Sequence, residues 1–410
     1  MKEHEPIIVG PWAGQLKYGE NPYQRAEAEV LKGIELYGSK PSFINWLDFS
    51  RAWPNVTEAS QALGGKSVAA SYKHTSIAGA GYAREFTDSE KKVFTRGKEL
   101  RNYLDAGNKL SPQANAYLRA TWCDRDASFG EMVGLSGILD YSTAVSMSGK
   151  RLDGIMCKGF DDEALSMVYR ERVIPVAVVT EEYEPPTHII RVTDIGVRLR
   201  EDRNTLVYDK KLFQSREQAR EGELYGFVVS KNKNIPQDNR DDVILTASSV
   251  KYSESNNVGI GLNGCTLNCA GGQKRVLSAQ IAAGRWIEFC MLQHPKVLGF
   301  KSSKSSLIYA HQERLALIRS MPPEERIDFV RTKFAHSVGV SDAMFPFDDG
   351  AKALLDVGVN LIVQPGGSAR DQMTIDTVDR HGATMIFARI KKPGSSRWED
   401  DYMARLFAHS

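Results

Sequence analysis

Apolar residues occur along this chain in two kinds of run, which alternate from end to end. Short runs of small and β-branched residues predict buried strands, whereas longer stretches with an apolar residue every three or four positions predict helices. Strands are expected at residues 67–72, 173–180, 226–230, 360–364 and 384–388. Helices are expected at 58–63, 161–172, 274–292, 313–320 and 369–379. Such alternation is typical of a layered α/β protein.

Turn-forming residues divide these elements. Gly64 and Gly65 should end the first predicted helix, because glycine readily adopts the left-handed conformation found there. The polar segments 181–187 and 198–204 predict surface connections. We therefore expect two lobes, residues 1–195 and 196–410, and see no short-period repeat.

A glycine pattern at residues 259–264 has the spacing of a dinucleotide-binding fingerprint, and it raises the alternative of an NAD-linked oxidoreductase. That fingerprint needs a strand before it and a helix directly after it. Here Asn263-Gly264 separates two strand-like runs, which instead predicts a β-hairpin with a type I′ turn. Cys265 and Cys269 fall in the second run without another Cys or His pair nearby, so we expect no metal site.

Residues 364–367, Gln-Pro-Gly-Gly, precede a segment that has the form of a helix capping box, Ser368 to Asp371. One interpretation is a well-formed connection between a strand and a helix. The other is a glycine-lined wall whose free amides face a ligand oxygen. The two interpretations are compatible.

Composition narrows the function classes. The chain has 410 residues, of which 42% are hydrophobic, as in ordinary globular proteins. Its 53 basic and 51 acidic residues leave a net charge of +2, so we expect neither a nucleic-acid nor a membrane partner. Charges at the N-terminus, where a secretory signal would be apolar, predict a cytoplasmic location. Five irregularly spaced cysteines predict free thiols.

Lys73 and His74 are the strongest candidates for chemistry. They place a cation beside a proton acceptor directly after the predicted strand 67–72, and a run of small residues follows at 78–81. Ligands in open α/β sheets gather at the carboxyl ends of strands, so we expect a site there.

Several short segments, taken together, carry a family resemblance. They are LKYGENPYQ (16–24), YKH (72–74), DRDASFG (124–130), DGI (153–155), KYSESNNV (251–258), AGGQKR (270–275), SDAMFPF (341–347) and RLFAH (405–409). In order and over nearly the whole chain they resemble the transformylase part of the bifunctional purine-biosynthesis enzyme AICAR transformylase/IMP cyclohydrolase. About fifteen residues precede the first segment, so we expect a stand-alone transformylase that does not close the ring to IMP.

The resemblance implies transfer of a formyl group from 10-formyltetrahydrofolate to the 5-amino group of AICAR, giving FAICAR and tetrahydrofolate. It implies a fold of two cytidine-deaminase-like α/β/α lobes, a homodimer with active sites at the subunit interface, and a potassium ion near the site. The Pro-Cys-x-x-Cys element of zinc deaminases is absent from the sequence, so only their scaffold is expected.

The resemblance also assigns roles to residues. His74 would be the general base on the AICAR amine, Lys73 the cation supporting the tetrahedral intermediate, and Asn256 a partner of the formyl oxygen or of His74. The residues expected to bind the nucleotide are Lys17, Tyr18, Asp153, Arg275, Arg405 and Phe407. The residues expected to contact the folate are Phe129, Phe345, Pro346, Phe347 and Asp349. Phe345 and Phe347 could equally be core aromatics, and Asp348 competes with its neighbour for the same role.

Three positions depart from the family pattern. Lys17 replaces an arginine and loses its forked hydrogen-bonding geometry, Ile77 replaces a proline, and Met344 replaces an aromatic residue. None of these changes removes the expected base, cation or amide. A non-catalytic binder or sensor of AICAR-like nucleotides remains the alternative function.

Overall fold

The computed structural model describes residues 5–269 and 271–407. Ala270, Ala408 and His409, which belong to the segments that carry the family resemblance, lie outside the described residues. No helix in the described ranges is both long and apolar enough to cross a membrane.

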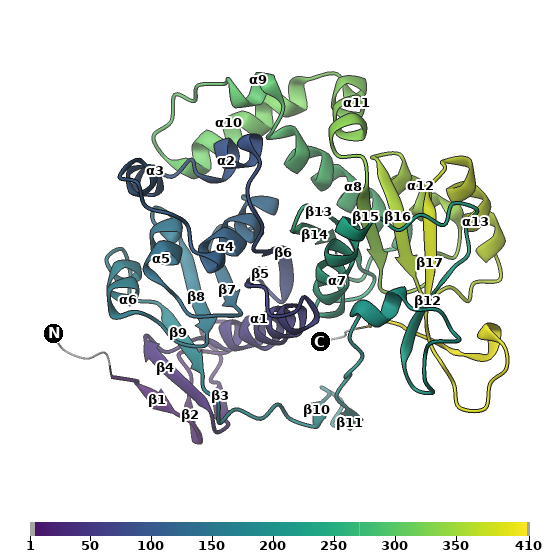
Figure 1. The fold of residues 1–410 in the computed structure, drawn as a ribbon. Coiled ribbons are helices and arrows are strands. Elements are labelled where there is room, and N and C mark those ends of the chain that lie inside the picture. Colours follow the sequence, from purple (N-terminus) through teal and green to yellow (C-terminus); the bar gives the residue numbers. More distant parts are fainter. Residues whose placement is uncertain (1–4, 270, 408–410) are drawn as a thin grey trace.

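One mixed sheet runs through the molecule (Figure 1) and confirms the predicted α/β class. Within the described residues its strands are, in spatial order, β1 Ile8–Val9, β4 Ile34–Gly38, β9 Pro175–Val179, β8 Leu152–Cys157, β7 Glu131–Leu135, β5 Val68–Lys73, β6 Ser76–Tyr82, β14 Cys265–Cys269, β13 Val258–Leu262, β15 Ser337–Ser341, β16 Val359–Gln364, β17 Thr384–Ile390 and β12 Leu224–Val228. A short strand, β18 Tyr402–Met403, pairs with β17. Pairing is parallel within β7–β8–β9 and β15–β16–β17 and antiparallel elsewhere.

Helices cover the faces of this sheet. Those in the first half of the chain are α1 Phe43–Ala62, α2 Asp88–Phe94, α3 Lys98–Asp105, α4 Pro112–Cys123, α5 Tyr141–Met147 and α6 Asp162–Tyr169. Those in the second half are α7 Gln237–Lys251, α8 Arg275–Met291, α9 Pro295–Leu298, α10 Leu307–Ser320, α11 Pro323–Lys333, α12 Asp348–Leu355 and α13 Asp371–Arg380, with 3₁₀ turns at Lys210–Phe213 and Trp398–Asp400.

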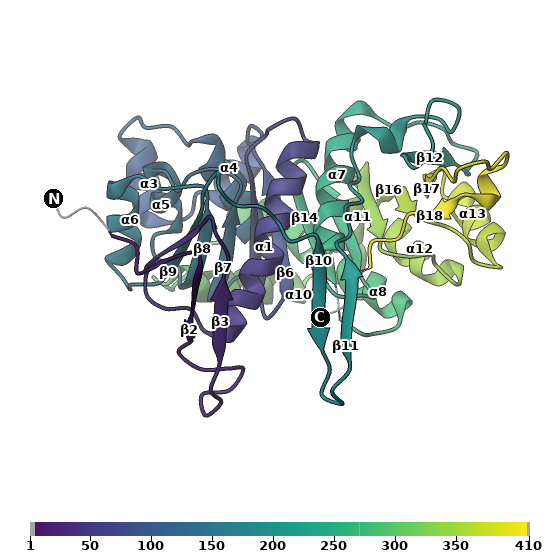
Figure 2. The same cartoon turned by 90° about the horizontal axis from the view of Figure 1, so that it is seen from below.

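Two further ribbons stand apart from the sheet. They are β2 Trp12–Gln15 with β3 Glu27–Val30, and β10 His188–Val192 with β11 Arg198–Asp202. Figure 2 shows both ribbons extending from the same side of the molecule. Residue 195, the predicted lobe boundary, lies in the turn between β10 and β11.

The two halves of the sheet repeat one order of elements, which no pattern in the sequence indicates. The first unit runs β4-α1-β5-β6-α4-β7-α5-β8-α6-β9, and the second runs β12-α7-β13-β14-α8-β15-α12-β16-α13-β17. The equivalent strands β6 and β14 join the units by pairing antiparallel, with Thr266 opposite Ala80 and Cys265 opposite Gly81. Because this junction is antiparallel, the start of β6 lies at one end of the strands and the start of β14 at the other. Equivalent turns of the two units therefore lie on opposite sides of the sheet, measured along the strand direction.

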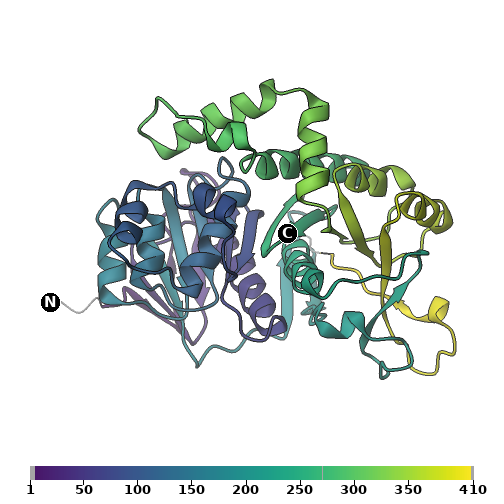
Figure 3. The same cartoon turned by 45° about the horizontal axis from the view of Figure 1, so that its top comes forward.

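The segment between α8 and β15 makes a second connection. Figure 3 shows its helices reaching across the first unit. His311 of α10 meets Trp122 of α4 edge-on, with ring centroids 5.9 Å apart. Trp122 and Trp286, from different units, belong to one buried hydrophobic core. The two units are therefore packed together as well as paired strand to strand.

The sequence predicts the strands better than the helices. All five predicted strands lie within two residues of β5, β9, β12, β16 and β17. Two helices are predicted only in their last turns, since α1 begins at Phe43 and α10 at Leu307. In α1, Pro54 and several polar residues interrupt the apolar pattern. The predicted helix end is confirmed, because Gly64 and Gly65 adopt φ values of 71° and 87° directly after α1.

The predicted hairpin is confirmed. Asn263 and Gly264 form the turn between β13 and β14 with φ values of 54° and 76°, as a type I′ turn requires. A helix does not follow, so the NAD interpretation of these glycines is wrong. The described cysteine side chains that are free and buried are Cys123, Cys157, Cys265 and Cys290.

The predicted capping box is wrong. Helix α13 begins after Arg370, and no side chain caps it. The carboxylate of Asp371 instead accepts the amide of Gly367 at 2.7 Å, so this amide does not face a ligand. The hydroxyl of Ser368 accepts the amide of Arg370, whereas a capping box would need it to accept the amide of Asp371.

Candidate active site

The turn between β5 and β6 presents Lys73 and His74. Lys73 ends β5, while His74 and Thr75 form a two-residue turn with φ values of 53° and 62°. The His74 side chain is exposed and the Lys73 side chain half-buried. The ammonium of Lys73 donates to the carbonyl oxygen of Phe129 at 2.6 Å and to that of Gly130 at 3.3 Å. The cation is therefore fixed beside an accessible imidazole.

A buried carboxylate supports this turn from below. Asp48 of α1 is 2% exposed and accepts the backbone amide of Thr75 at 2.6 Å. Burial raises the pKa of Asp48 to about 6, although the Thr75 amide, His74 and Lys73 favour its charged form.

Asp153 lies on the same side of Gly130 as the Lys73 ammonium. A side chain at Gly130, where φ is 73°, would stand 2.7 Å from the Lys73 ammonium and 3.1 Å from the Asp153 carboxylate. Asp153 also pairs with Arg172 at 3.4 Å and with Arg151 at 3.9 Å. Glycine therefore permits a close approach of a cation, a carboxylate and the backbone.

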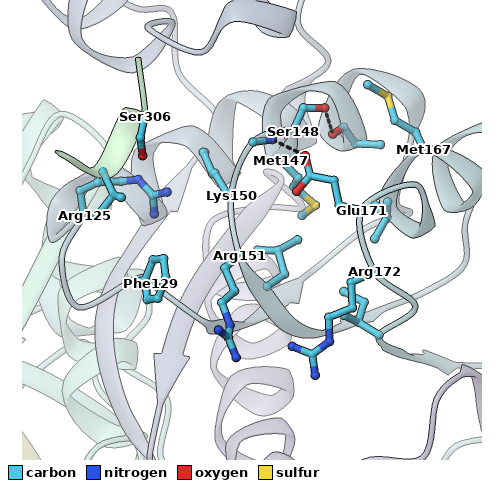
Figure 4. Close-up of a pocket in the computed structure, with 16 residues that line it drawn as sticks. Arg125, Phe129, Met147, Ser148, Lys150, Arg151, Met167, Glu171, Arg172 and Ser306 are labelled. Carbon is cyan, nitrogen blue, oxygen red and sulfur yellow. Dashed lines mark hydrogen bonds between the residues drawn. The ribbon is translucent and has the colours of Figure 1, made fainter. Parts of the chain in front are cut away.

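A basic cavity of about 480 Å³ adjoins this group (Figure 4). Its basic side chains are Arg125, Lys150, Arg151 and Arg172, and its wall includes Phe129, whose carbonyl oxygen accepts from Lys73. Arg125 is 2% exposed, and its Nε and Nη1 atoms have no partner among the described residues. Burial, and secondly the Arg125 guanidinium, lowers the pKa of Lys150 well below its usual value. Such a cavity favours an anionic group.

A second group surrounds Asn256. Its side-chain oxygen accepts from Arg275 at 2.6 Å, and its amide nitrogen donates to the carbonyl of Gln273 at 2.7 Å. Arg275, at the start of α8, forms an ion pair with Asp342, which is 1% exposed. These bonds hold the Asn256 side chain in one orientation.

The register of the strands brings the two groups to the same end of the sheet. Thr266 pairs with Ala80 and Cys269 with Val258, so the end of β14 lies between the starts of β6 and β13. Strands are about 4.8 Å apart, which puts those two starts roughly 10 Å from each other. Neither Lys73 nor His74 shares a hydrogen bond or ion pair with Asn256 or Arg275 in the described structure.

Lys73 and His74 lie at the carboxyl end of β5, as expected, but β5 is antiparallel to both of its neighbours. Lys73 ends an antiparallel strand, and its neighbours Gly130 and Asp153 belong to the amino ends of β7 and β8. The hairpin between β5 and β6 reverses the chain, so the end of β5 meets the beginnings of the parallel strands.

The remaining nucleotide candidates are spread over both groups. Arg405 lies 5.4 Å from the ring of Phe407, and its Nε has no partner among the described residues. The amide of Leu406 donates to the carbonyl of Asp342, which ties this segment to the Asn256 group. Lys17 is exposed above the ring of Tyr18, and the carbonyl of Tyr18 accepts the amide of Phe43 at the start of α1.

The folate candidates differ in exposure. Phe129 and Phe347 are 42% and 44% exposed, whereas Phe345 is 1% exposed and lies in the hydrophobic core. Asp348 bonds to Thr377 of α13, whereas Asp349 is exposed, as is Pro346. Phe345 thus has the core role left open by the sequence.

The other two departures from the family pattern lie in or near strands. Ile77 is buried in β6 opposite Tyr72, and Met344 is half-buried just after β15. Among the described residues, no group of three or more His, Cys, Asp or Glu side chains could hold a metal ion.

Comparison with known proteins identifies the family of this chain. Residues 7–285 match the family model described as AICARFT/IMPCHase bienzyme. The chain belongs to this family. The match includes the Lys73 turn as well as Asn256 and Arg275, whereas Asp342 lies beyond it.

Relatives in this bienzyme family include three proteins named bifunctional purine biosynthesis protein PurH. That of Aquifex aeolicus is 25% identical over 387 residues, which cover 92% of this chain and 58% of the relative. That of Elusimicrobium minutum is 25% identical over 395 residues, covering 94% and 59%, respectively. That of Leptospira biflexa is 24% identical over 392 residues, covering 92% and 58%. The chain thus spans about three fifths of the length of these relatives.

Sequence reasoning misses several residues of the site. Asp48, Arg125, Lys150, Arg151 and Arg172 lie outside the motif assignments, and the fold gathers them from separate segments. Arg125 is the one of these residues that lies in a segment carrying the resemblance, 124–130. No spacing to another residue of the sequence indicates what Arg125 does.

Proposed function

We propose that this chain transfers the formyl group of 10-formyltetrahydrofolate to the 5-amino group of AICAR, giving FAICAR and tetrahydrofolate in purine biosynthesis. One observation carries the proposal. In a member of the AICARFT/IMPCHase bienzyme family, the Lys73 ammonium is held by two backbone carbonyls beside an exposed His74.

The chemistry needs a base and a cation together, because the AICAR amine is a weak nucleophile whose lone pair is delocalised into its ring. As the amine nitrogen attacks the formyl carbon, the His74 imidazole takes the proton that the amine loses. Lys73 directs its remaining N–H toward the formyl oxygen and stabilises the negative charge that develops there. The bond from the formyl carbon to N10 then breaks, and the proton is returned to N10.

The two substrates use different parts of this site. We assign the nucleotide phosphate to the basic side chains near Asp153, which are Arg151 and Arg172. Lys17, Arg275 and Arg405, the residues expected from the resemblance, remain further candidates for contacts with the nucleotide. We assign the folate ring to the exposed aromatic Phe129, which lines the cavity. Asp349 follows β15, which lies five strands from β7 in the sheet, so Asp349 would bind the polar edge of this ring from a second copy of the chain.

The proposal includes a homodimer. Among the described residues, no hydrogen bond or ion pair joins Lys73 or His74 to Asn256 or Arg275, and we propose that a second copy supplies side chains between them. Exposed apolar residues on the β10–β11 ribbon, including Ile190, Val192 and Leu199, offer a surface for such a contact.

The experiment is to mix the purified chain with AICAR and 10-formyltetrahydrofolate and follow tetrahydrofolate release together with FAICAR formation. We expect the two products to form in equal amounts. Binding of AICAR in a calorimeter without turnover would instead identify a nucleotide binder or sensor. The expectation that the chain does not close the ring stays a prediction, which the same assay tests by the presence or absence of IMP.

A further inference from the structure

The two hairpin turns of the structural repeat are held by equivalent carboxylates. Asp48 and Asp242 are each the sixth residue of the equivalent helices α1 and α7. Asp48 accepts the amide of Thr75 at 2.6 Å, and Asp242 accepts the amides of Asn263 and Gly264 at 2.9 and 2.7 Å. Both carboxylates are at most 2% exposed. The same device therefore occurs at opposite ends of the sheet.

The two turns differ in the residues that form them. Asn263 and Gly264 are the residues that adopt positive φ most readily. His74 and Thr75 have the same left-handed conformation at φ values of 53° and 62°, although the β-branched threonine disfavours it. Backbone strain of this kind persists only where the surrounding structure holds it, and it is concentrated at functional sites.

The contacts around Asp48 show what holds the strained turn. The Asp48 carboxylate accepts a hydrogen bond from the backbone amide of Thr75. The side chains of Lys73 and His74 also interact electrostatically with this carboxylate. The ammonium group at the end of the Lys73 side chain is held separately, by the carbonyl oxygens of Phe129 and Gly130. The base and the cation are thus located by contacts on two sides.

We propose that Asp48 is a positioning residue for formyl transfer, which holds the strained turn so that His74 and Lys73 face the reacting atoms together. The proposal rests on the proposed function. Asp48 is buried under the turn, so it acts through Thr75 and His74 without touching the substrate.

The test compares Asp48→Ala and Asp48→Asn with the matched controls Asp242→Ala and Asp242→Asn, below the unfolding temperature of every variant. We expect Asp48→Ala to lower kcat at least tenfold while the KM for AICAR changes less than twofold. Asp48→Asn should lose less, because its carboxamide oxygen still accepts the Thr75 amide. The Asp242 variants should lose thermal stability to a similar degree and keep kcat within twofold.

A kcat within twofold of wild type in both Asp48 variants would overturn the proposal, as would an equal loss in the Asp242 variants. Amide hydrogen exchange at Thr75 separates this proposal from the proposed function, since it needs no turnover. Even if the wild type releases no tetrahydrofolate, exchange that is faster in Asp48→Ala and unchanged in Asp242→Ala supports the positioning role. Equal exchange in wild type and Asp48→Ala contradicts it.

Discussion

At the scale of single residues, the site depends on a glycine that lets three groups approach one another. Gly130 has a positive φ, and its carbonyl accepts the Lys73 ammonium while Asp153 lies on the same side. The backbone therefore sets the position of the cation as much as the lysine does.

Gly130→Ala tests this arrangement. The new methyl group would lie 2.7 Å from the Lys73 nitrogen, so we expect the ammonium to leave its two carbonyl partners. A misplacement of about 1 Å can reduce turnover roughly a hundredfold, and we expect a loss of kcat between about tenfold and a hundredfold.

Gly107→Ala is the matched control for this prediction. Gly107 also has a positive φ, and no atom lies within 4 Å of the added methyl group. In both variants an alanine must adopt a positive φ, which destabilises the folded state by a similar amount, roughly 1–2 kcal/mol. Equal kcat values in the two variants would contradict the role of Gly130.

At the scale of elements, the hairpins and their supporting helices are the units that carry the site. The Asn263-Gly264 turn follows from sequence because both residues favour positive φ, whereas His74-Thr75 gives no such signal. The start of α1, which brings Asp48 under the turn, is also hidden, because Pro54 and polar side chains interrupt its apolar pattern. Local conformational preferences thus predict the turn at Asn263-Gly264, but they do not predict the turn at His74-Thr75, which carries the proposed base.

Asp242 gives the second hairpin a pH dependence with a defined sign. Burial raises the pKa of Asp242 from 3.8 to about 6. The neutral form is therefore favoured in the folded state, and the stability it contributes is lost as the pH rises from about 4 through about 6. A difference of about two pKa units corresponds to about 3 kcal/mol.

Urea unfolding of wild type and Asp242→Asn between pH 4 and pH 7 checks this sign. Asparagine does not ionise, so between pH 4 and pH 7 the free energy of unfolding of wild type should fall by roughly 2 kcal/mol relative to that of the variant, the rest of the change lying below pH 4. A difference that stays constant over this range, or that changes in the opposite direction, would contradict the assignment.

At the scale of the whole molecule, one sheet and one shared core join the two units. The pairing of β6 with β14 depends on contacts between residues far apart in the sequence, and no local pattern indicates it. The same is true of the basic cavity, whose Arg125, Lys150 and Arg172 come together only in the fold. The motifs predict which residues matter, but their distances depend on this long-range pairing.

The continuous sheet predicts that the two units unfold together. Tryptophan fluorescence reports on the shared core through Trp122 and Trp286, and far-ultraviolet circular dichroism reports on both units. We expect the two signals to give a single coincident transition in urea. Two separated transitions would show that the junction does not couple the units.

The most direct test of the central claim is the kcat for formyl transfer from 10-formyltetrahydrofolate to AICAR in His74→Ala, compared with wild type and with a control, the variant His381→Ala at the exposed end of α13. Loss of a general base typically lowers turnover by about 10²–10⁴, so we expect a loss in that range for His74→Ala and wild-type turnover for His381→Ala. Full activity of His74→Ala would contradict the account.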